Sequence, residues 1–598
     1  MIFKKITKST AQVLMLFEGN ERSKLFLLLV GMFFMGLLEV IGVASIAPFM
    51  AVVSNPEIIH QNHYLFSIYK HFNFEDSNSF LLALGLFAIF LVIFSNMFSA
   101  IINWKIITMS RIQAHIVSLR LLKKYLTQPY LFYLNQNTSS LAKNILSEVD
   151  RTVNGVVLPG LLALSRGAIA IFILIFLLYL NVILALISIL VLGSIYGLIY
   201  LTIKQRLSAY GESASAADSK RYKTAAEAMS GIKAIKLHRT EEIFLRRFEI
   251  PSKKRAELTA YSQLSSILPR YLLDAIAFSA ILLVMIIMVF LGKSSVEIIP
   301  IVTVFAFAGY RLMPALQQIY ASSTQLKFNF PALSILVNDL LIVNEYSIEN
   351  IDDQSQFLFS NKLSLDNVSF KYPHTSESTL NNININIEPN TTIGLVGQTG
   401  SGKTTLIDVI LGLLKPSSGK LFLDSVELSD ANISIWQKNI GYVPQDIYII
   451  DDTIENNIAF GKSTFDQNKI KNAAVISEID EFIQTLPLGY KTIVGERGVR
   501  LSGGQRQRLG IARALYDDPK VIVFDEATSA LDGDTESLIM KAISNLSQKK
   551  TIIMIAHRVT TLKGCDIIYI LDKGKIVNSG SYGDLLNSDK KFKSLSNF

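Results

Sequence analysis

Cysteine is almost absent from this chain, since Cys565 is the only one among 598 residues. No disulfide can form within the chain, so the fold does not depend on oxidative cross-links outside the cell. Charge is also scarce, because only 18% of the residues are Asp, Glu, Lys or Arg. Half of the residues are hydrophobic and the mean hydropathy is +0.37. This balance is typical of proteins that keep much of their apolar surface in lipid, and it predicts a membrane protein.

Long apolar runs are confined to the first part of the chain, and none follows Ser322. A membrane-spanning helix needs about 20 mainly apolar residues. Six stretches meet this requirement, and we predict spans at about 25–53, 80–104, 156–180, 182–203, 268–291 and 298–322. The first stretch is too long, and its Pro48 lies too late, for a cleaved signal peptide. We therefore expect the first span to remain in the protein.

The net charge of +8 suggests nucleic-acid binding until the positions of lysine and arginine are considered. Five precede the first span, seven lie in 105–151 and fourteen in 204–270, whereas only Lys70 and Lys293 lie in the alternate loops. Positive residues mark the cytoplasmic side of membrane proteins. We therefore predict a multi-pass protein of the cytoplasmic (inner) membrane with a cytoplasmic amino terminus, and no nucleic-acid partner.

The connections differ in length between the two sides. The two basic ones lack a Gly, Pro or Ser bias, so we expect helical extensions of the spans into the cytoplasm. On the outer side only 54–79 has substance, and Leu65, Ile68, Tyr69 and Phe72 fall at helical spacing within it. They predict one apolar face of a short helix that lies on the outer leaflet or covers an opening. An ordinary loop is the alternative.

Near Asn350 the pattern changes to short β-like runs, such as 392–396, 521–524 and 552–555, that alternate with helical stretches. This alternation is typical of α/β domains. The predicted fold class is therefore multidomain: an all-α six-helix transmembrane domain in 1–345, followed by an α/β P-loop domain in 346–598.

The run 392–396 leads into a segment that matches G-x-x-x-x-G-K-[ST], with a strand before it and a helix after it. Its residues are Gly397, Gln398, Thr399, Gly400, Ser401, Gly402, Lys403 and Thr404, and Thr405 completes the predicted ATP site. Glycines let backbone N–H groups approach phosphate oxygens, and the following helix adds its positive end. Lys403 would neutralise the β and γ phosphates, and the Thr404 hydroxyl would hold Mg²⁺.

Two acids, Asp525 and Glu526, end the hydrophobic run 521–524. Asp525 would reach the metal, and Glu526 is placed to polarise an attacking water as general base. A buried strand with two terminal carboxylates also occurs without catalytic meaning. The glycine-rich segment upstream and the sequence Ser529-Ala530-Leu531-Asp532 downstream favour the catalytic interpretation.

A second anion-binding helix start precedes the helical run 506–515, formed by Leu501, Ser502, Gly503, Gly504 and Gln505. One nucleotide does not need two such loops, so we infer that this loop serves ATP held by another copy. These residues resemble the ATP-binding cassette family, for which LSGGQ is a specific motif, and the match covers essentially the whole chain. The resemblance implies an exporter-type half-transporter, an ATP hydrolase coupled to transport that works as a homodimer.

The resemblance also implies roles for single residues. Tyr372 matches the aromatic residue that stacks on adenine, and Gln445 matches the glutamine that senses the metal and the γ-phosphate. His557 matches the switch histidine, and Asp532 matches the acid that communicates across the dimer. The implied cofactors are ATP and Mg²⁺. The implied metal-site residues are Thr404, Gln445 and Asp525, and the implied catalytic residues are Glu526, His557 and Gln445.

Contacts between the two domains are implied in the same way. The segment 495–498 resembles the exporter-type segment that meets the cytoplasmic loops. Short contact helices at the tips of the cytoplasmic extensions are expected around 128–135 and 238–248 by their order along the chain.

Two charged residues lie near mid-bilayer in the predicted spans, where charge is costly and usually functional. Glu39 lies about 15 residues into the first span and Arg311 about 13 residues into the sixth, at 1.5 Å per residue. They form a structural ion pair, or Arg311 contacts the substrate, because a guanidinium binds phosphate or pyrophosphate bidentately.

The strings 39–49 and 310–315 resemble the exporters that flip lipid-linked oligosaccharides, whose substrates carry a polyprenyl tail, a pyrophosphate and a sugar chain. The expected function is ATP-driven export or flipping of such an amphipathic, lipid-linked glycan or glycolipid, with membrane lipid as a further partner. The alternatives are a multidrug, lipid, peptide or siderophore exporter, and a gated channel or regulator of the same family.

Overall fold

The computed structural model describes residues 11–180, 182–290, 295–342, 359–373, 375–526, 533–556, 558–590 and 592–593. The chain forms two compact units. The first comprises Met1–Gln128 and Asn135–Glu345, and the second comprises Pro129–Leu134 and Tyr346–Phe598. The second unit thus takes a short segment from within the first half of the chain.

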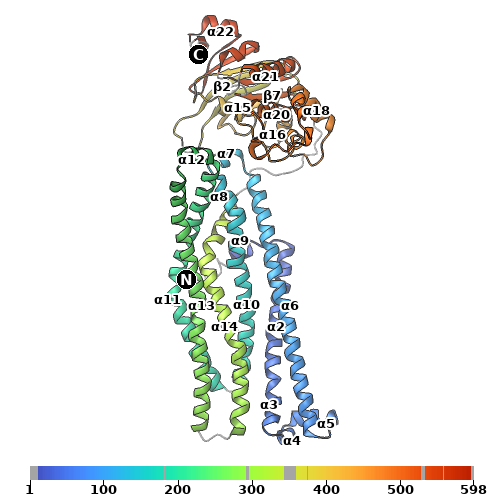
Figure 1. The fold of residues 1–598 in the computed structure, drawn as a ribbon, viewed down its shortest axis with the longest axis vertical. Coiled ribbons are helices and arrows are strands. Elements are labelled where there is room, and N and C mark those ends of the chain that lie inside the picture. Colours follow the sequence, from blue (N-terminus) through green and yellow to red (C-terminus); the bar gives the residue numbers. More distant parts are fainter. Residues whose placement is uncertain are drawn as a thin grey trace. The chain divides into compact units, whose positions relative to one another are not determined.

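The first unit is built from helices, and its long helices run side by side (Figure 1). These are α2 (Asn20–Ala44), α6 (Ser77–Leu126), α10 (Leu158–Leu180), α11 (Val182–Ser230), α13 (Glu241–Phe290) and α14 (Ser295–Leu341). The shorter helices are α3 (Ile46–Ser54), α4 (Ile58–Gln61), α5 (His63–His71), α8 (Thr138–Lys143), α9 (Val149–Thr152) and α12 (Ile232–His238). Two π-helical turns, Asn144–Glu148 and Val153–Val157, flank α9.

Three helical stretches among the described residues are long and apolar enough to cross a membrane: Asn20–Ser54, Ser77–Leu126 and Thr138–Leu180. They contain the first three predicted spans. The other three predicted spans, 182–203, 268–291 and 298–322, fall on α11, α13 and α14, whose side chains are described only in part.

The first predicted span contains a break. Helix α2 ends at Ala44 and α3 begins at Ile46, with Ser45 between them. The hydroxyl of Ser45 donates to the carbonyl oxygen of Gly42 at 2.8 Å, a side-chain bond that competes with the helix ladder. Pro48 follows in the first turn of α3, where its missing N–H costs least. Sequence periodicity alone predicted an unbroken helix here.

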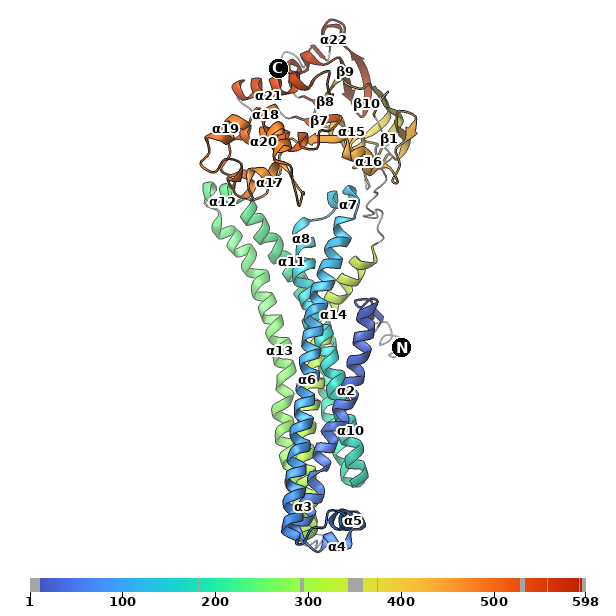
Figure 2. The same ribbon diagram turned by 90° about the vertical axis from the view of Figure 1, so that its right-hand side faces the viewer.

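The outer segment is largely helical, and α4 and α5 lie together at one end of the helices (Figure 2). Helix α5 begins after Asn62, whose side chain accepts hydrogen bonds from two backbone N–H groups of the first turn. Leu65 packs with the buried side chains of Val52, Ile59 and Phe80, whereas Ile68 and Phe72 are 44% and 68% exposed. Only part of the predicted apolar face therefore packs against the ends of the spans, and the rest is exposed.

The second unit contains two sheets. A six-stranded sheet has the order β10-β9-β3-β8-β7-β6, in which all strands except β10 are parallel. Its strands are β3 (Thr392–Val396), β6 (Ile440–Val443), β7 (Val521–Asp525), β8 (Thr551–Ile555), β9 (Ile567–Asp572) and β10 (Lys575–Gly580). An antiparallel sheet has the order β2-β1-β4-β5. Its strands are β1 (Leu363–Phe370), β2 (Leu380–Ile387), β4 (Ser418–Leu423) and β5 (Val426–Glu427).

The helices of this unit cover the sheets. They are α7 (Tyr130–Leu134), α15 (Lys403–Ile410), α16 (Ile433–Lys438), α17 (Ile454–Ile458), α18 (Gln467–Ile476), α19 (Asp480–Thr485), α20 (Gly503–Leu515), α21 (Gly533–Leu546) and α22 (Tyr582–Ser588). Strands β3, β7 and β8 are buried throughout, as expected for parallel strands covered on both faces. Their carboxyl ends lie at the same edge of the sheet, which is where α/β proteins bind ligands.

Two short helices bear on the predicted contact segments. Helix α7 lies within the predicted segment 128–135 and belongs to the second unit, where Leu131 packs against the hydrophobic core. The other short helix, α12, ends at His238, and α13 begins at Glu241. The predicted segment 238–248 therefore begins at the last residue of the short helix, and its contact with the second unit stays a prediction.

Candidate functional site

The glycine-rich loop joins β3 to α15 in a conformation that requires glycine. Gly400 and Gly402 have φ of 80° and 103°, in the region that side chains disfavour. A Cβ on Gly397 would lie 2.2 Å from the carbonyl oxygen of Leu571. The loop therefore brings bare backbone to the amino end of a helix, the arrangement that binds phosphate.

Lys403 begins α15 and is buried against this loop. Its Nζ donates to the carbonyl oxygens of Gly397 at 2.8 Å and Gln398 at 3.1 Å. Burial lowers the pKa of Lys403, and the charges of Glu526 and Asp525 oppose that shift. A buried ammonium held mainly by neutral carbonyl groups is under-compensated, and phosphate oxygens would supply the missing charge.

Ser401 gives a second sign that the loop fits phosphate. Its Oγ is buried and has no hydrogen-bond partner among the described residues. Such an unsatisfied buried hydroxyl is rare in proteins and points to a missing partner. The side chain of Thr404 is exposed, so its hydroxyl oxygen is available as a metal ligand. The tight turn leaves backbone N–H groups that can donate to a triphosphate.

Tyr372, the predicted adenine-stacking residue, lies beside α15. Its hydroxyl is 3.1 Å from Oγ1 of the buried Thr405, and its ring meets Phe370 edge-on with centroids 4.9 Å apart. The segment that follows β1 therefore contacts the first turn of α15, the helix after the phosphate loop, through this hydrogen bond.

The two predicted acids lie where β7 ends. Asp525 is buried, and the hydroxyl of Tyr442 donates to its Oδ2 at 3.3 Å. Burial raises the pKa of Asp525, while the Tyr442 bond opposes that shift. Glu526 has a φ of 51°, which is uncommon for a residue with a side chain and occurs often at functional sites.

Gln445 and Glu526 come together although 81 positions separate them in the chain. Nε2 of Gln445 donates to Oε2 of Glu526 at 2.8 Å. Within the described residues no group of three or more His, Cys, Asp and Glu side chains is placed to hold a metal ion. A metal here would be held by the Thr404 hydroxyl, Gln445 and Asp525 with phosphate and water, a donor set of oxygens that suits Mg²⁺.

The second predicted anion-binding loop forms the start of α20. Ser502 caps this helix: its Oγ accepts from the N–H of Gln505 at 3.2 Å, and its own N–H donates to Oε1 of Gln505 at 2.9 Å. This reciprocal capping box fixes the loop, and Gly503 and Gly504 follow without side chains over the helix end. Two other predicted residues, Asp532 and His557, lie outside the described residues.

Sequence reasoning missed two polar residues near Asp525. One is Tyr442, which strand pairing places beside β7 and which no local pattern marks. The other is Asp408 in α15, where burial and the charge of Asp525 raise the pKa from 3.8 to about 6. A signal for Asp408 was present, because it is the only acid in the apolar run 406–411.

The two predicted intramembrane charges form an ion pair in the first unit. Nη1 of Arg311 lies 3.2 Å from Oε2 of Glu39, and it also donates to Oδ1 of Asn96 at 3.2 Å. The hydroxyl of Ser99 donates to Oε1 of Glu39 at 3.0 Å. The Glu39 side chain is 4% exposed, whereas that of Arg311 is 26% exposed.

Comparison with known proteins agrees with both units. Residues 380–529 match the family described as ABC transporter, and residues 23–313 match the ABC transporter transmembrane region. The heterocyst differentiation ATP-binding protein HepA of Nostoc sp. is 33% identical over 65% of this chain and 63% of its own length, which is less than two thirds of that protein. The ATP-dependent lipid A-core flippase of Paraburkholderia xenovorans is 30% identical over 77% of this chain and 76% of its own length.

A solved structure of a bacterial Atm1-family ABC exporter with ATP bound has the same fold. The two structures superpose with a TM-score of 0.78 over 96% of this chain and 97% of that chain, at 22% sequence identity. At this level of identity the likeness establishes the arrangement of helices and strands and nothing about the transported molecule.

The raised pKa of Asp408 predicts a pH-dependent stability of the second unit. The folded pKa exceeds the unfolded one, so ionisation opposes folding and stability is lost as pH rises from about 4 to about 6. Asp408→Asn is expected to raise the free energy of unfolding at pH 7.5, without nucleotide, by on the order of 1–3 kcal/mol. In a Trp104→Phe background the buried Trp436 reports denaturant unfolding of this unit alone. An equal effect at pH 4.5 would contradict the prediction.

The position of Glu526 at the end of β7, in contact with Gln445, predicts the effect of removing the Glu526 charge. Glu526→Gln is expected to bind ATP normally but to hydrolyse it at least about a hundredfold more slowly, because the predicted general base is replaced by a neutral amide. Glu427→Gln, which removes an exposed carboxylate paired with Lys420, is the matched control for charge. Phosphate release and nucleotide binding are measured on the same preparations. Near-normal turnover in Glu526→Gln would contradict the role of Glu526 as general base.

Proposed function

Because this chain belongs to the ABC transporter family, as an exporter half-transporter with a helical membrane domain and one ATP-binding cassette, we propose that it flips or exports a lipid-linked glycan across the cytoplasmic membrane. The cassette hydrolyses ATP, and hydrolysis is coupled to transport.

The Arg311 guanidinium carries the proposal about the substrate. The hydrogen bond to Asn96 and the 3.2 Å contact with Glu39 both use Nη1, and among the described residues Nε and Nη2 donate no hydrogen bond. Nε and Nη2 form one edge of the guanidinium, which binds two oxygens of a phosphate at once. A pyrophosphate between a lipid tail and a sugar chain presents such oxygens.

The relatives support an amphipathic substrate. The Paraburkholderia xenovorans protein is an ATP-dependent lipid A-core flippase, and its name favours a lipid-anchored molecule for this chain. The sequence strings around Glu39 and Arg311 resemble those of lipid-linked oligosaccharide flippases. Together they favour a polyprenyl-linked oligosaccharide over a hydrophobic drug or a siderophore.

We further propose that two copies form a homodimer in the membrane, with both cassettes on the cytoplasmic side. The Lys403 loop of one copy and the Ser502 loop of the other would hold one ATP between them. Lys403 and Ser401 would bind the phosphates, Thr404 and Asp525 the Mg²⁺, and Glu526 would take a proton from the attacking water. Bound Mg²⁺ supplies charge neutralisation at the phosphates.

ATP would then act by shifting a population. It binds the closed pair of cassettes better than the open pair, and hydrolysis removes the γ-phosphate that makes the difference. Gln445 would report this change: its amide nitrogen donates to Glu526, and with nucleotide bound its amide oxygen would instead hold the metal.

The substrate class is tested with purified protein in lipid vesicles. A polyprenyl-pyrophosphate glycan is expected to stimulate ATP hydrolysis and to cross the bilayer only when ATP is supplied. Vesicles that hold the Glu526→Gln protein are the control for passive movement. If hydrophobic drugs stimulate hydrolysis and the glycan does not, a drug exporter is the better assignment. ATP-dependent ion conductance without glycan movement favours a gated channel.

The role of Arg311 is tested separately. Arg311→Ala is expected to reduce glycan transport to background while the cassettes still bind ATP, because the phosphate-binding edge is removed and Glu39 loses its partner. Arg270→Ala breaks the exposed pair with Asp274 on α13 and is the matched control. The double variant Arg311→Met, Glu39→Gln removes the buried unpaired carboxylate. Transport by this double variant at the normal rate would reduce Arg311 to a packing residue.

A further inference from the structure

A polar cavity of about 450 Å³ lies between α11 and α13 in the first unit. Neither the proposed ATP site nor the Arg311 pair uses it. The polar side chains that line it are Asp218, Arg221, Tyr222, Arg255, Thr259 and Gln263. The position of these residues on two long helices makes the cavity part of the helical framework rather than of a surface loop.

One buried carboxylate serves both guanidinium groups of the cavity. Oδ2 of Asp218 accepts from Nε of Arg255 at 2.7 Å, and Oδ1 accepts from Nη1 of Arg221 at 2.8 Å. The Asp218 side chain is 7% exposed and that of Arg255 is 19% exposed. The Arg221 side chain is 34% exposed, so solvent reaches this side of the cavity. Two positive charges share one negative charge, which leaves an excess of positive charge at the cavity wall.

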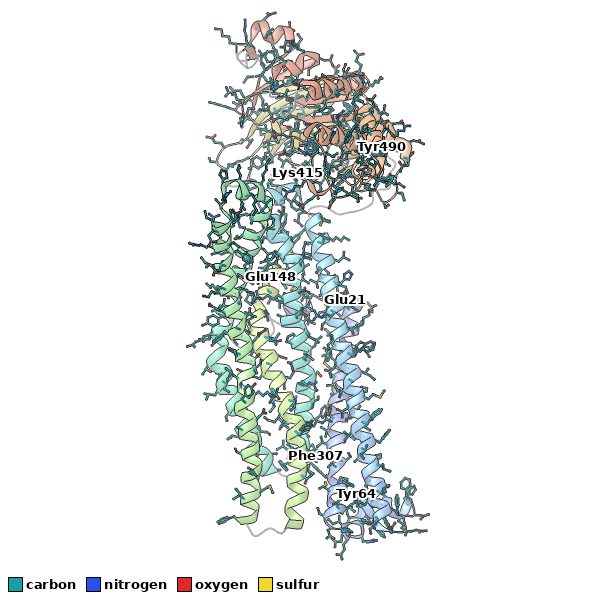
Figure 3. All side chains as sticks on the ribbon, viewed as in Figure 1. Glu21, Tyr64, Glu148, Phe307, Lys415 and Tyr490 are labelled. Carbon is teal, nitrogen blue, oxygen red and sulfur yellow. The ribbon has the colours of Figure 1, made fainter. Side chains whose placement is uncertain are left out.

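The neighbouring ion pairs do not remove this excess. Glu148, labelled among the helices of the first unit in Figure 3, is fully buried and lies 3.0 Å from Lys143 and 3.8 Å from Arg151. The guanidinium groups of Arg151 and Arg255 lie over the same ring of Phe328, at 5.4 and 5.9 Å. The joined cluster therefore holds four cations and two carboxylates, namely Lys143, Arg151, Arg221 and Arg255 with Glu148 and Asp218.

Arg221 provides an independent sign of a missing partner. Its Nε is buried and has no hydrogen-bond partner among the described residues. Its guanidinium lies over the ring of Phe248 at 5.7 Å, which holds the group flat at the cavity wall. A buried N–H of a charged group is expensive to leave unpaired, and an anion in the cavity would satisfy it.

We propose that this cavity binds a soluble phosphorylated compound. A phosphate group supplies the negative charge that the cluster lacks, and its oxygens suit the edge of the Arg221 guanidinium. The hydroxyl groups of Tyr222 and Thr259 and the amide of Gln263 line the same cavity and are donors for the remaining oxygens.

The position along the chain argues against a lipid phosphate. Asp218 lies 15 residues beyond the predicted end of the fourth span at 203, which is about 22 Å along a helix. The headgroup layer extends only about 5–8 Å beyond the hydrocarbon core. A ligand of this cavity therefore comes from the aqueous phase, whichever molecule the protein transports.

Inorganic pyrophosphate is the probe for this site. Calorimetric titration uses the full-length protein in phosphatidylcholine nanodiscs at about 0.15 M salt, without Mg²⁺ and with Lys403→Ala to silence the phosphate loop. One saturable site per chain is expected. Arg221→Gln should weaken binding at least about tenfold, and Arg221→Lys should give an intermediate loss because it keeps the charge but not the planar edge.

Arg246→Gln is the matched control, because Arg246 lies on α13 in an exposed pair with Glu242 and outside the cavity. Pyrophosphate binding should be unchanged in this variant. The proposal is overturned if the Lys403→Ala protein shows no saturable binding, or if Arg221→Gln binds as tightly as its parent. An equal loss in Arg246→Gln also overturns it, since binding would then follow net charge. None of these outcomes alters the expected transport of a glycan.

Discussion

Parallel pairing of β3, β8 and β7 is the constraint on which the chemistry of this protein depends. Because β8 pairs with both neighbours, the loop after β3 and the acids after β7 leave the sheet at one edge. Lys403 then lies close enough to Asp525 and Glu526 for their charges to oppose the effect of burial on its pKa. A shift in strand order would leave each motif intact and separate the charges that act together.

Cations whose hydrogen-bonding groups are only partly used occur in both units. Lys403 is held by two neutral carbonyl oxygens, Arg311 shares one Nη1 between Glu39 and Asn96, and Arg221 shares Asp218 with Arg255. In each case part of the hydrogen-bonding capacity of a cation is left over, although the Arg311 and Arg221 side chains are 26% and 34% exposed. A phosphate group would use this capacity in all three places, so the ATP site, the proposed substrate contact and the proposed cavity ligand would share one chemistry.

Motifs that are contiguous in the sequence were predictable because their geometry is local. The glycine-rich loop from Gly397 to Thr404 and the helix start at Ser502 need only neighbouring residues to form, and a helix begins after each of them as expected. The contact of Gln445 with Glu526 brings together two residues to which the family resemblance assigns roles at one site, and those roles stay predictions.

Features that depend on strand register or helix packing were not predictable. The bond from Tyr442 to Asp525 exists because β6 pairs with β7 in one register. Asp218 and Arg255 meet because α11 and α13 pack together, and nothing in either segment alone marks the partner. The break at Ser45 and the end of α12 at His238 have local causes that periodicity does not report: the Ser45 hydroxyl donates to Gly42, and Arg239 has a left-handed backbone.

The two anion-binding loops of the cassette differ in how far they are already satisfied. The loop of Lys403 leaves Ser401 Oγ without a partner among the described residues and its ammonium on neutral carbonyl groups. At the start of α20, by contrast, the side chains of Ser502 and Gln505 satisfy two backbone N–H groups reciprocally. A phosphate gains more from the first loop, because binding there relieves an existing cost. A phosphate gains less from the second loop, because the capping box already bonds two of its backbone N–H groups. In the proposed homodimer this difference sets an order: ATP binds the Lys403 loop of one copy first, and the Ser502 loop of the other copy closes on it afterwards.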